Sequence, residues 1–465
     1  MTRSSTILAA VISAVICSSC VISPKATVTS SAQEIKGEAQ DRIIEAYRPS
    51  SNSGESFQDR TQEIVGDALK LIDRNEREGA SFDQHWYTFR RFGENLEQIF
   101  TAHEVRFYGG PEADILPALK DRYVSVTPIQ PNQDPSEIRL FQGYRGTGSP
   151  DLIIIGQNGR EVALKTVIRL VDLFGFINQR HKRTFPEGLP SFLRRVRVYL
   201  SSTPPRQEFI AFFRQYHISD PDVVIIGFER DARAVFKQAG IGEPKRYSSA
   251  SLRINWYPDA DGKKVLLVSI NGNRIFASRA GELVKAIFEA FRLPPRTLIF
   301  FGSAGAINFA NSVGQIVAPT VVLMDDFFKS NGDSKKIPQI IRNRAAMIVP
   351  VKTVHTSVES VAVETVNWAR ANSQKRIVTV DQELYHVINA INASPYASSI
   401  HLYVGMFLTD NVSVGPLSRE TLEKAEDLIV RTDAVRQEFL AKILVDESFH
   451  LGPQQHWRRQ VETTK

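Results

Sequence analysis

The stretch FFGSAGAINFANSVGQIVAP, residues 300–319, begins as the end of a buried strand and then continues in small residues. Gly302, Ser303, Ala304 and Gly305 stand where a core segment would carry bulky side chains. Open α/β sheets bind ligands at the carboxyl ends of their parallel strands, and glycine lets a ligand approach the backbone closely. We therefore predict a strand over 297–302, followed by a turn that serves either as a ligand site or as a tight packing turn.

Apolar runs typical of buried strands alternate with helical patterns on both sides of this stretch. The strand-like runs lie at residues 151–156, 196–200, 223–227, 264–270, 321–325, 347–354, 376–381 and 401–410, and the helical patterns at 162–177, 232–239 and 277–291. In the last of these, Leu283, Ile287 and Phe291 lie on one apolar stripe that would cover a sheet. The alternation predicts an α/β fold, with a C-terminal three-layer α/β/α domain around a mixed, mostly parallel central sheet.

The length of 465 residues and a hydrophobic content of 42% predict a globular protein of two domains with flanking segments. Residues 58–203 form the predicted N-terminal domain, mainly helical or α+β, and residues 204–465 form the predicted C-terminal domain. The formal charge of +6 favours a solvated basic face over an anionic ligand or a membrane surface. The most basic segment, residues 177–197, lacks the interleaved aromatic residues of nucleic-acid binders, so we expect no nucleic-acid partner.

The first twenty residues, MTRSSTILAAVISAVICSSC, have the pattern of a secretory signal peptide. Their apolar run is short for a membrane span, and a short membrane anchor is the alternative interpretation. Cys20 at the cleavage point would be acylated in a bacterial lipoprotein, although Cys17 stands where that consensus prefers Leu. We predict residues 1–20 as the signal, residues 21–57 as a flexible tether, and an exported protein that is either periplasmic or a membrane-anchored lipoprotein.

Four short segments with polar or acidic residues follow the small-residue stretch along the chain. They are VGQIVAP at 313–319, HTSVES at 355–360, TVDQEL at 379–384 and FLTDN at 407–411, with GFERDARAVF upstream at 227–236. In this order and spacing the segments resemble the nucleoside phosphorylase and nucleosidase superfamily. That family carries a Gly-Ser/Thr-Ala-Gly turn, a Val-Asp-Met-Glu segment and a late Ser-Asp. The resemblance covers roughly residues 222–430, under half of the chain.

The resemblance implies a role for each matching residue. Glu383 would accept hydrogen bonds from the ribose hydroxyls, and Asp410 would donate or share a proton at a ring nitrogen of a purine base. Asp231 would orient water, with Glu229 as an alternative; both could instead be acids that favour the start of a helix. The implied substrate-binding residues are Gly302, Ser303, Ala304, Gly305, Thr356, Ser357, Val361, Gln382 and Glu383.

Three positions depart from the family pattern. Gln382 replaces the methionine that packs against the ribose, and Gln315 replaces the aspartate of Val-Gly-Asp. Val361 stands where the family places an aromatic ring on the base, a contact worth about 1–3 kcal/mol. The phosphate-binding arginine two residues before the Gly-Ser turn is Phe300 here, which favours hydrolysis over phosphorolysis.

The expected function is that of an exported N-ribosyl hydrolase that cleaves the C–N glycosidic bond of a purine nucleoside or a related compound. A nucleoside-binding receptor without catalysis, and a phosphate-dependent phosphorylase, are the alternatives. We expect no cofactor, because no His/Cys/Asp group has metal-ligand spacing and no phosphate-loop or Gly-x-Ser-x-Gly motif is present. The resemblance implies a homo-oligomer, usually a dimer.

Overall fold

The protein is described here by a computed structural model. It describes residues 57–451 except for 79–98, 130–137, 181–187, 250–251, 270–276, 308–312, 327–334, 350–351, 359–362, 413–423 and 425–426 and the single residues 100, 111, 147 and 365. All described residues belong to one compact unit, Tyr47–Lys465. The predicted signal peptide with Cys20, and the predicted tether apart from Phe57, lie outside the described residues. Among the helices that are described, none is both long enough and apolar enough to span a bilayer.

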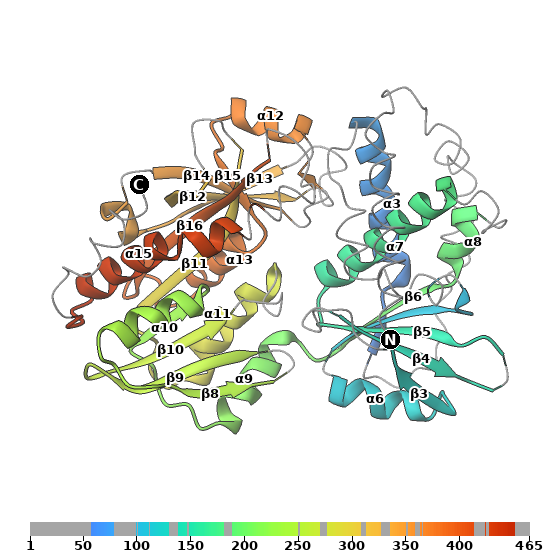
Figure 1. Cartoon of the computed structure of the whole chain (residues 1–465), viewed down its shortest axis with the longest axis horizontal. Coiled ribbons are helices and arrows are strands. Elements are labelled where there is room, and N and C mark those ends of the chain that lie inside the picture. Colours follow the sequence, from blue (N-terminus) through green and yellow to red (C-terminus); the bar gives the residue numbers. More distant parts are fainter. Residues whose placement is uncertain are drawn as a thin grey trace, which may run out of the picture. The chain divides into compact units, whose positions relative to one another are not determined.

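Residues 57–201 build a six-stranded mixed sheet in the order β1-β6-β2-β5-β4-β3 (Figure 1). Its strands are β1 (Phe57–Asp59), β2 (Val105–Gly109), β3 (Ser125–Pro128), β4 (Ile138–Tyr144), β5 (Asp151–Gly156) and β6 (Val196–Ser201), and its helices are α3 (Thr61–Glu78), α6 (Glu112–Lys120), α7 (Arg160–Arg180) and α8 (Gly188–Arg194). The predicted strand over 151–156 is confirmed, and every residue of β5 is buried. This sheet supports the second of the two predicted alternatives, a mixture of helices and strands.

The C-terminal part forms a ten-stranded sheet in the order β13-β12-β14-β15-β11-β7-β10-β9-β8, with β16 paired to β11 and β12. Its strands are β7 (Val223–Ile226), β8 (Lys245–Ser248), β9 (Arg253–Ala260), β10 (Lys263–Ser269), β11 (Thr297–Ala306), β12 (Ile316–Asp326), β13 (Lys335–Ile340), β14 (Lys352–Val358), β15 (Thr379–Asp381) and β16 (His401–Asn411). Strand β11 is parallel to β7 and β16 but antiparallel to β15, so the central sheet is mixed as predicted.

Helices cover both faces of this second sheet (Figure 1). They are α9 (Pro205–Gln215), α10 (Glu229–Gln238), α11 (Ser278–Ala290), α12 (Val366–Gln374), α13 (Leu384–Asn392) and α15 (Asp433–Asp446), with a 3₁₀ turn η3 (Arg344–Met347). One buried cluster joins β11 to α9, α11 and α13, and another joins it to α10 and α15. The predicted three layers of the C-terminal part are therefore present.

Strand β11 runs four residues further than its predicted end at Gly302. The small residues do not form a turn, because both neighbouring strands continue to pair with them. Gly305 and Ala306 lie opposite Val380 and Thr379 of β15, and the same two residues pair with β16 on the other side. The prediction of a turn over 302–305 is wrong, and the segment is an extended strand with its backbone held on both edges.

The strand predicted from Met347 also begins later than expected. Residues Arg344–Met347 form the turn η3, in which the Asn343 side chain accepts a hydrogen bond from the backbone N–H of Ala345 at 3.0 Å. The Asn343 amide also donates to the carbonyls of Pro319 and Val404. This buried asparagine anchors the turn to two strands, and the strand β14 starts only at Lys352.

Candidate active site

The carboxyl-terminal part of β11 is the centre of the candidate site. Ser303 is exposed, whereas Gly305 is buried. Residues two apart in a strand project from the same face, and the rise of a strand separates them by about 7 Å. Ala304 belongs to the core on the other face, with α9, α11 and α13. Of the four small residues 302–305, therefore, only Ser303 and Gly305 lie on the face of β11 that is turned away from this core.

Asp410 lies directly beside Gly305. The two residues are paired in register across β11 and β16, after an irregularity that shifts the register between Ala304 and Gly305. A Cβ atom at Gly305 would lie 3.3 Å from Asp410 Oδ2. The Thr409 hydroxyl donates to Asp410 Oδ1 at 2.8 Å, and burial raises the pKa of Asp410 above its usual range. Burial therefore favours the protonated form of this carboxyl group over the charged one.

Substitution of Gly305 tests whether this close approach shapes the site. A Cβ atom there would also lie 2.7 Å from Val412 Cγ2 and 3.3 Å from Val380 Cγ1. We expect Gly305→Ala to destabilise the protein by about 1–3 kcal/mol through overpacking, measured by urea unfolding. Gly66→Ala in α3 is the control, because its Cβ meets no atom within 4 Å and should stabilise by about 0.5–1 kcal/mol. Equal stability of the two variants would contradict the tight packing at Gly305.

Glu383 stands between β15 and α13, as the residue that precedes the first turn of the helix. Its carboxylate accepts long hydrogen bonds of 3.4 Å from the backbone N–H groups of Ala277 and Gln382. Burial, followed by the negative charge of Asp381, raises the pKa of Glu383 to about 8. The two backbone donors and the positive charge of Lys165 in α7 act in the opposite direction. A group with this pKa is close to its titration point at physiological pH.

A buried polar network fixes the end of β15 and the start of α13, on either side of Glu383. Asp381 Oδ1 accepts from the Ser357 hydroxyl at 2.6 Å and contacts His355 Nε2 at 2.8 Å. Asp381 Oδ2 accepts from the backbone N–H of Leu384, and Ser357 Oγ accepts from that of Tyr385. His355 and Ser357 have no exposed surface. Ser357, predicted to bind substrate, is therefore seen in this structure fixing the start of α13.

Glu364 is a further acid at this end of the sheet, and the sequence patterns did not point to it. Burial, followed by the negative charges of Asp410, Asp381 and Glu383, holds the pKa of Glu364 well above its usual range. Glu364 follows Val363, which packs in the same buried cluster as Val380 and Val412. Glu383 and Asp410, two of the predicted acids, thus lie near enough to one further carboxyl group for both charges to act on it.

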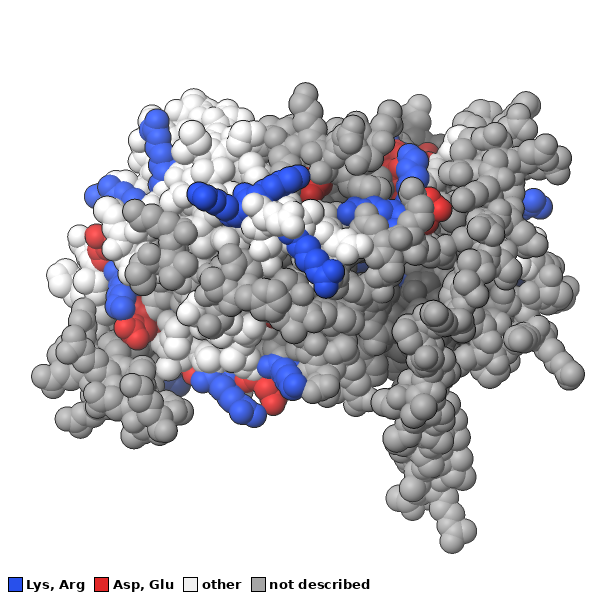
Figure 2. Space-filling model, turned by 90° about the horizontal axis from the view of Figure 1, so that it is seen from above, with Lys and Arg blue, Asp and Glu red and all other residues white. Residues whose placement is uncertain are grey.

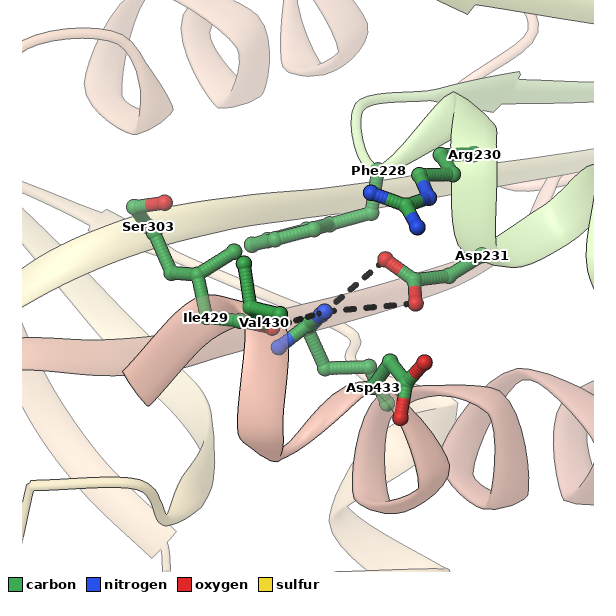
Figure 3. Close-up of a pocket in the computed structure, with 8 residues that line it drawn as sticks. Phe228, Arg230, Asp231, Ser303, Ile429, Val430 and Asp433 are labelled. Atoms are coloured by element: carbon green, nitrogen blue, oxygen red, sulfur yellow. Dashed lines mark hydrogen bonds and ion pairs between the residues drawn. The ribbon is translucent and has the colours of Figure 1, made fainter. Parts of the chain in front are cut away.

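Asp231, the third predicted acid, lies in a pocket of about 220 Å³ that includes Ser303 (Figure 3). The pocket is lined by Phe228, Arg230, Asp231, Ser303, Ile429, Val430, Asp433 and Arg436. In Figure 3 the ring of Phe228 extends from the start of α10 toward Ser303. Two arginines and two aspartates give the lining a formal charge of zero. Ser303 lies on the same face of β11 as Gly305, the residue beside Asp410, but neither Gly305 nor Asp410 lines this pocket.

Both oxygens of Asp231 are bound by Arg436 of α15. The Nε–Oδ2 distance is 3.0 Å and the Nη2–Oδ1 distance is 3.3 Å, and both side chains are almost fully buried. The guanidinium lies over the rings of Phe228 and Phe407, at 4.9 Å and 5.0 Å from their centroids. Burial raises the pKa of Asp231, and the ion pair with Arg436 opposes that shift. The alternative acid, Glu229, accepts instead from Asn255.

The remaining predicted site residues have different surroundings. Thr356 is fully buried, and its hydroxyl lies 3.4 Å from the carbonyl of Leu323. A Cβ atom at Gly302 would meet Phe300 and Met406 of the core. Gln382 is 5% exposed, and Val361 lies outside the described residues. Asp381 stood inside a motif that we quoted, whereas no local signal pointed to Glu364 or Arg436.

One group of potential metal ligands lies in the six-stranded sheet, within the part of the chain that is described. It consists of His103, Glu104 and Asp151. Asp151 accepts from Arg145 Nη2 at 2.5 Å and from Tyr123 at 2.6 Å, and Glu104 is paired with Arg106 and Arg145. Arginine and tyrosine donors thus occupy the carboxylates, and we assign no metal to this group. On the face shown in Figure 2, described Lys and Arg side chains are spread among acids rather than gathered in one patch.

Comparison with known proteins gave matches at the level of structure only. No family model and no curated protein matches the chain. A 5′-methylthioadenosine/S-adenosyl homocysteine nucleosidase of Campylobacter jejuni matches with 11% identity and a TM-score of 0.38, covering 48% of this chain and 98% of that one. The Neisseria meningitidis enzyme, in complex with methylthio-immucillin-A, matches with 15% identity and a TM-score of 0.37, over 48% and 97% of the chains. Futalosine hydrolase of Helicobacter pylori matches with 12% identity and a TM-score of 0.38, over 49% and 98%. These solved structures are hydrolases of the class that the sequence motifs resemble. At such values the similarity carries no argument about activity, and the proposals below depend on this chain's own residues.

Proposed function

We propose that the protein is an N-ribosyl hydrolase that cleaves the C–N glycosidic bond of a purine nucleoside or a related compound. The observation that carries this proposal is the grouping of acids around Ser303 and Gly305. Asp410 touches the Gly305 position, and Asp231 shares a pocket with Ser303. Glu383 follows β15, which pairs with β11 in the antiparallel sense at Gly305. The negative charges of Glu383 and Asp410 both act on Glu364, so these two acids lie at the same end of the sheet.

Glu383 is the proposed sugar-binding group. A carboxylate accepts hydrogen bonds from two vicinal hydroxyls, and its negative charge favours a sugar ring that becomes cationic as the C–N bond breaks. The long hydrogen bonds from Ala277 and Gln382 leave acceptor capacity on both oxygens for these hydroxyls.

Asp410 is the proposed proton donor to the base, and the pocket at Ser303 is the proposed position of the attacking water. The C1′–N bond breaks and its electron pair stays on the base, which takes a proton from Asp410. The water oxygen bonds to C1′ and gives its proton to the Asp231 carboxylate. Exchange with solvent then removes this proton and reprotonates Asp410, so the products are the free base and ribose. Ser303 and Asp231 are the groups that orient this water, and Arg436 fixes Asp231 in position.

Hydrolysis is distinguished from phosphorolysis by the second product. Purified protein is incubated with adenosine, inosine and methylthioadenosine, with and without inorganic phosphate, and the products are separated by chromatography. Free base with ribose, at a rate independent of phosphate, supports the proposal. Ribose 1-phosphate would support the phosphorylase alternative, for which the presence of Arg230 and Arg436 near Ser303 speaks. The two aspartates in the same pocket balance these arginines, so the lining has no net positive charge to hold an anion, which is why we favour water.

The receptor alternative also has a specific observation behind it. Both oxygens of Asp231 are occupied by Arg436, and Ser357 is taken up by the network of Asp381. A binding protein could retain the sugar-binding Glu383 while lacking an acid that is available to water. Calorimetry that detects nucleoside binding, together with no base release over hours, would replace the hydrolase by this receptor.

The pKa of Glu383 predicts a pH dependence of stability. Because the pKa rises in the folded state from 4.5 to about 8, the protonated form contributes stability that is fully present below about 4.5 and is lost as pH rises through 8. We expect Glu383→Gln, which stays neutral, to gain in Tm relative to the natural protein as pH increases over this window. Thermal unfolding between pH 4.5 and 9 measures the difference, and a constant difference would contradict the assigned pKa.

Export and assembly complete the proposal. The N-terminal pattern over 1–20 supports export, with attachment to a membrane through an acylated Cys20 as one form of it. The resemblance to the superfamily supports a homo-oligomer. Mass spectrometry of the protein from a bacterial membrane fraction tests acylation, and light scattering tests the oligomeric state.

A further inference from the structure

Ala277, the residue before α11, has a backbone conformation that residues with a side chain rarely adopt. Its φ is 49° and its ψ is −124°, and it is fully buried. Its backbone N–H donates to Glu383 Oε1 at 3.4 Å. Strained conformations of this kind persist only where the surrounding structure holds them, and they are common at functional sites. The contacts made next to Ala277 therefore decide how its N–H meets the carboxylate of Glu383.

The two residues that follow Ala277 are held by the N-terminal part of the protein, which builds the six-stranded sheet. The Ser278 hydroxyl donates to Glu161 Oε2 of α7 at 2.9 Å. Arg279 Nη1 donates to the carbonyl oxygen of Asn158 at 2.8 Å, and the Arg279 side chain has almost no exposed surface. Asn158 stands between β5 and α7. The first sheet and its helix α7 thus fix the start of α11, which covers the second sheet.

Lys165 lies one helical turn beyond Glu161 in α7. Side chains four residues apart in a helix share a face, so Lys165 lies on the face of α7 that contacts the start of α11. Burial, followed by the charge of Asp381, raises the pKa of Glu383, whereas the positive charge of Lys165 acts to lower it. Glu364 is a further acid that interacts with the carboxylate of Glu383. Lys165 therefore opposes the effect of two neighbouring acids on this carboxylate.

An apolar cluster gives independent evidence that α7 packs at this end of the second sheet. Leu164 and Ile168, on either side of the lysine in α7, belong to the same buried cluster as Val380 of β15 and Val412. Both valines also approach the Cβ position of Gly305. The apolar face of α7 is therefore part of the core that surrounds the carboxyl end of β11.

We propose that the N-terminal part of the protein completes the active site, with Glu161 and Lys165 of α7 as positioning residues for Glu383. Glu161 holds the backbone whose N–H donates to the Glu383 carboxylate, and Lys165 places a positive charge near that carboxylate. Neither residue needs to touch the substrate, because each acts through Glu383. This inference depends on the proposed function, which assigns the sugar to Glu383. The motifs that resemble the nucleosidase superfamily begin at about residue 222, so the resemblance assigns no role to α7.

Substitution of Glu161 in the full-length protein tests the first of these roles. Glu161→Ala removes the acceptor of the Ser278 hydroxyl, and we expect kcat/KM for adenosine to fall by about tenfold or more, because small displacements of positioning groups are costly. Glu161→Gln keeps a side-chain oxygen that can accept from Ser278, so it should recover most of this loss. Glu282→Ala in α11 is the matched control, since it breaks a partly exposed pair with Lys285 and should keep the natural kcat/KM.

Substitution of Lys165 tests the second role through a pH profile. Without its positive charge, the pKa of Glu383 rises further, so less of the group is charged at neutral pH. We expect Lys165→Met to move the profiles of kcat/KM and of calorimetric affinity for adenosine toward higher pH. Its deficit should be largest near pH 7, below the natural pKa of about 8, and shrink toward pH 9. Lys165→Arg should restore the natural profile, and Lys70→Met, which breaks an exposed pair with Asp67, should not move it.

The outcomes separate this inference from the proposed function. Base release that neither Glu161→Ala nor Lys165→Met alters would overturn the role of α7 and leave the hydrolase in place. Adenosine binding that responds to both substitutions, without any base release, would support α7 and overturn the hydrolase. An equal loss in Glu282→Ala, or a lower Tm in Lys165→Met with an unmoved pH profile, would make α7 a purely structural element and overturn the inference. Absence of both binding and base release would overturn both proposals.

Discussion

Asp410→Asn is expected to lower kcat for nucleoside cleavage by about 10²–10⁴-fold, the usual contribution of a positioned general acid. Asparagine has the shape of aspartate, and its carbonyl oxygen can still accept from the Thr409 hydroxyl. It has no acidic proton to transfer to the departing base. Steady-state kinetics with inosine measures the change, and the loss should appear in kcat rather than as a rise in KM alone.

Two comparisons decide how that result is interpreted. Asp427→Asn removes an exposed carboxylate that is paired with Arg431, and its kcat should remain that of the natural protein. Because burial raises the pKa of Asp410, the neutral asparagine should not lower Tm at neutral pH. An Asp410→Asn protein that keeps its kcat within about threefold would remove Asp410 from the mechanism, since general acids contribute far more.

Arg436→Met is expected to lower the free energy of unfolding by about 3–5 kcal/mol, because it leaves the buried Asp231 carboxylate without its partner. Both side chains are nearly fully buried, and the guanidinium also loses its contacts with the rings of Phe228 and Phe407. Urea unfolding at neutral pH measures the loss. The base-release activity should fall with it, since Asp231 would no longer be fixed beside Ser303.

The double variant Arg436→Met/Asp231→Asn separates the ion pair from the packing. It removes both charges, so we expect it to be more stable than Arg436→Met alone. Without the arginine, burial raises the pKa of Asp231 in the folded protein, so protonated Asp231 stabilises that state as pH falls. The deficit of Arg436→Met should therefore shrink as pH is lowered toward 3.8, the ordinary pKa of the group. If the free energy of unfolding of Arg436→Met lay within about 1 kcal/mol of that of the natural protein, the Arg436–Asp231 pair would contribute no more than an exposed ion pair.

The hydrogen-bond network of Asp381 shows how a residue predicted to bind substrate can instead hold a neighbouring residue in position. Ser357 and His355 both contact Asp381, whose other oxygen accepts from the first turn of α13. That turn immediately follows Glu383, so the network fixes the residue that we assign to the sugar. The sequence motif around Ser357 is informative about the site even though this side chain is buried beneath it.

The amino-acid sequence by itself predicted most of the buried strands and pointed to the acids that the proposed function uses. Apolar runs such as those of β5, β7 and β16 specify buried strands because the hydrophobic pattern is local. Glu383 and Asp410 were singled out by the resemblance of their motifs to a known superfamily, and the local strand pattern only indicated that each lies at or just after the end of a strand. The predicted end of β11 was wrong. Small residues have only a weak local preference for strand or turn, and pairing with β15 and β16 decided that this segment is extended.

Only the tertiary structure decided which groups meet. Arg436 and Asp231 are 205 residues apart in the chain, and no local pattern connects α15 to α10. Glu364 is brought to the other acids by the packing of Val363, and the contact between α7 and Ser278 joins residues that are 117 positions apart. Contacts of this kind depend on sheet register and long-range burial, which are properties of the assembled fold rather than of any short segment.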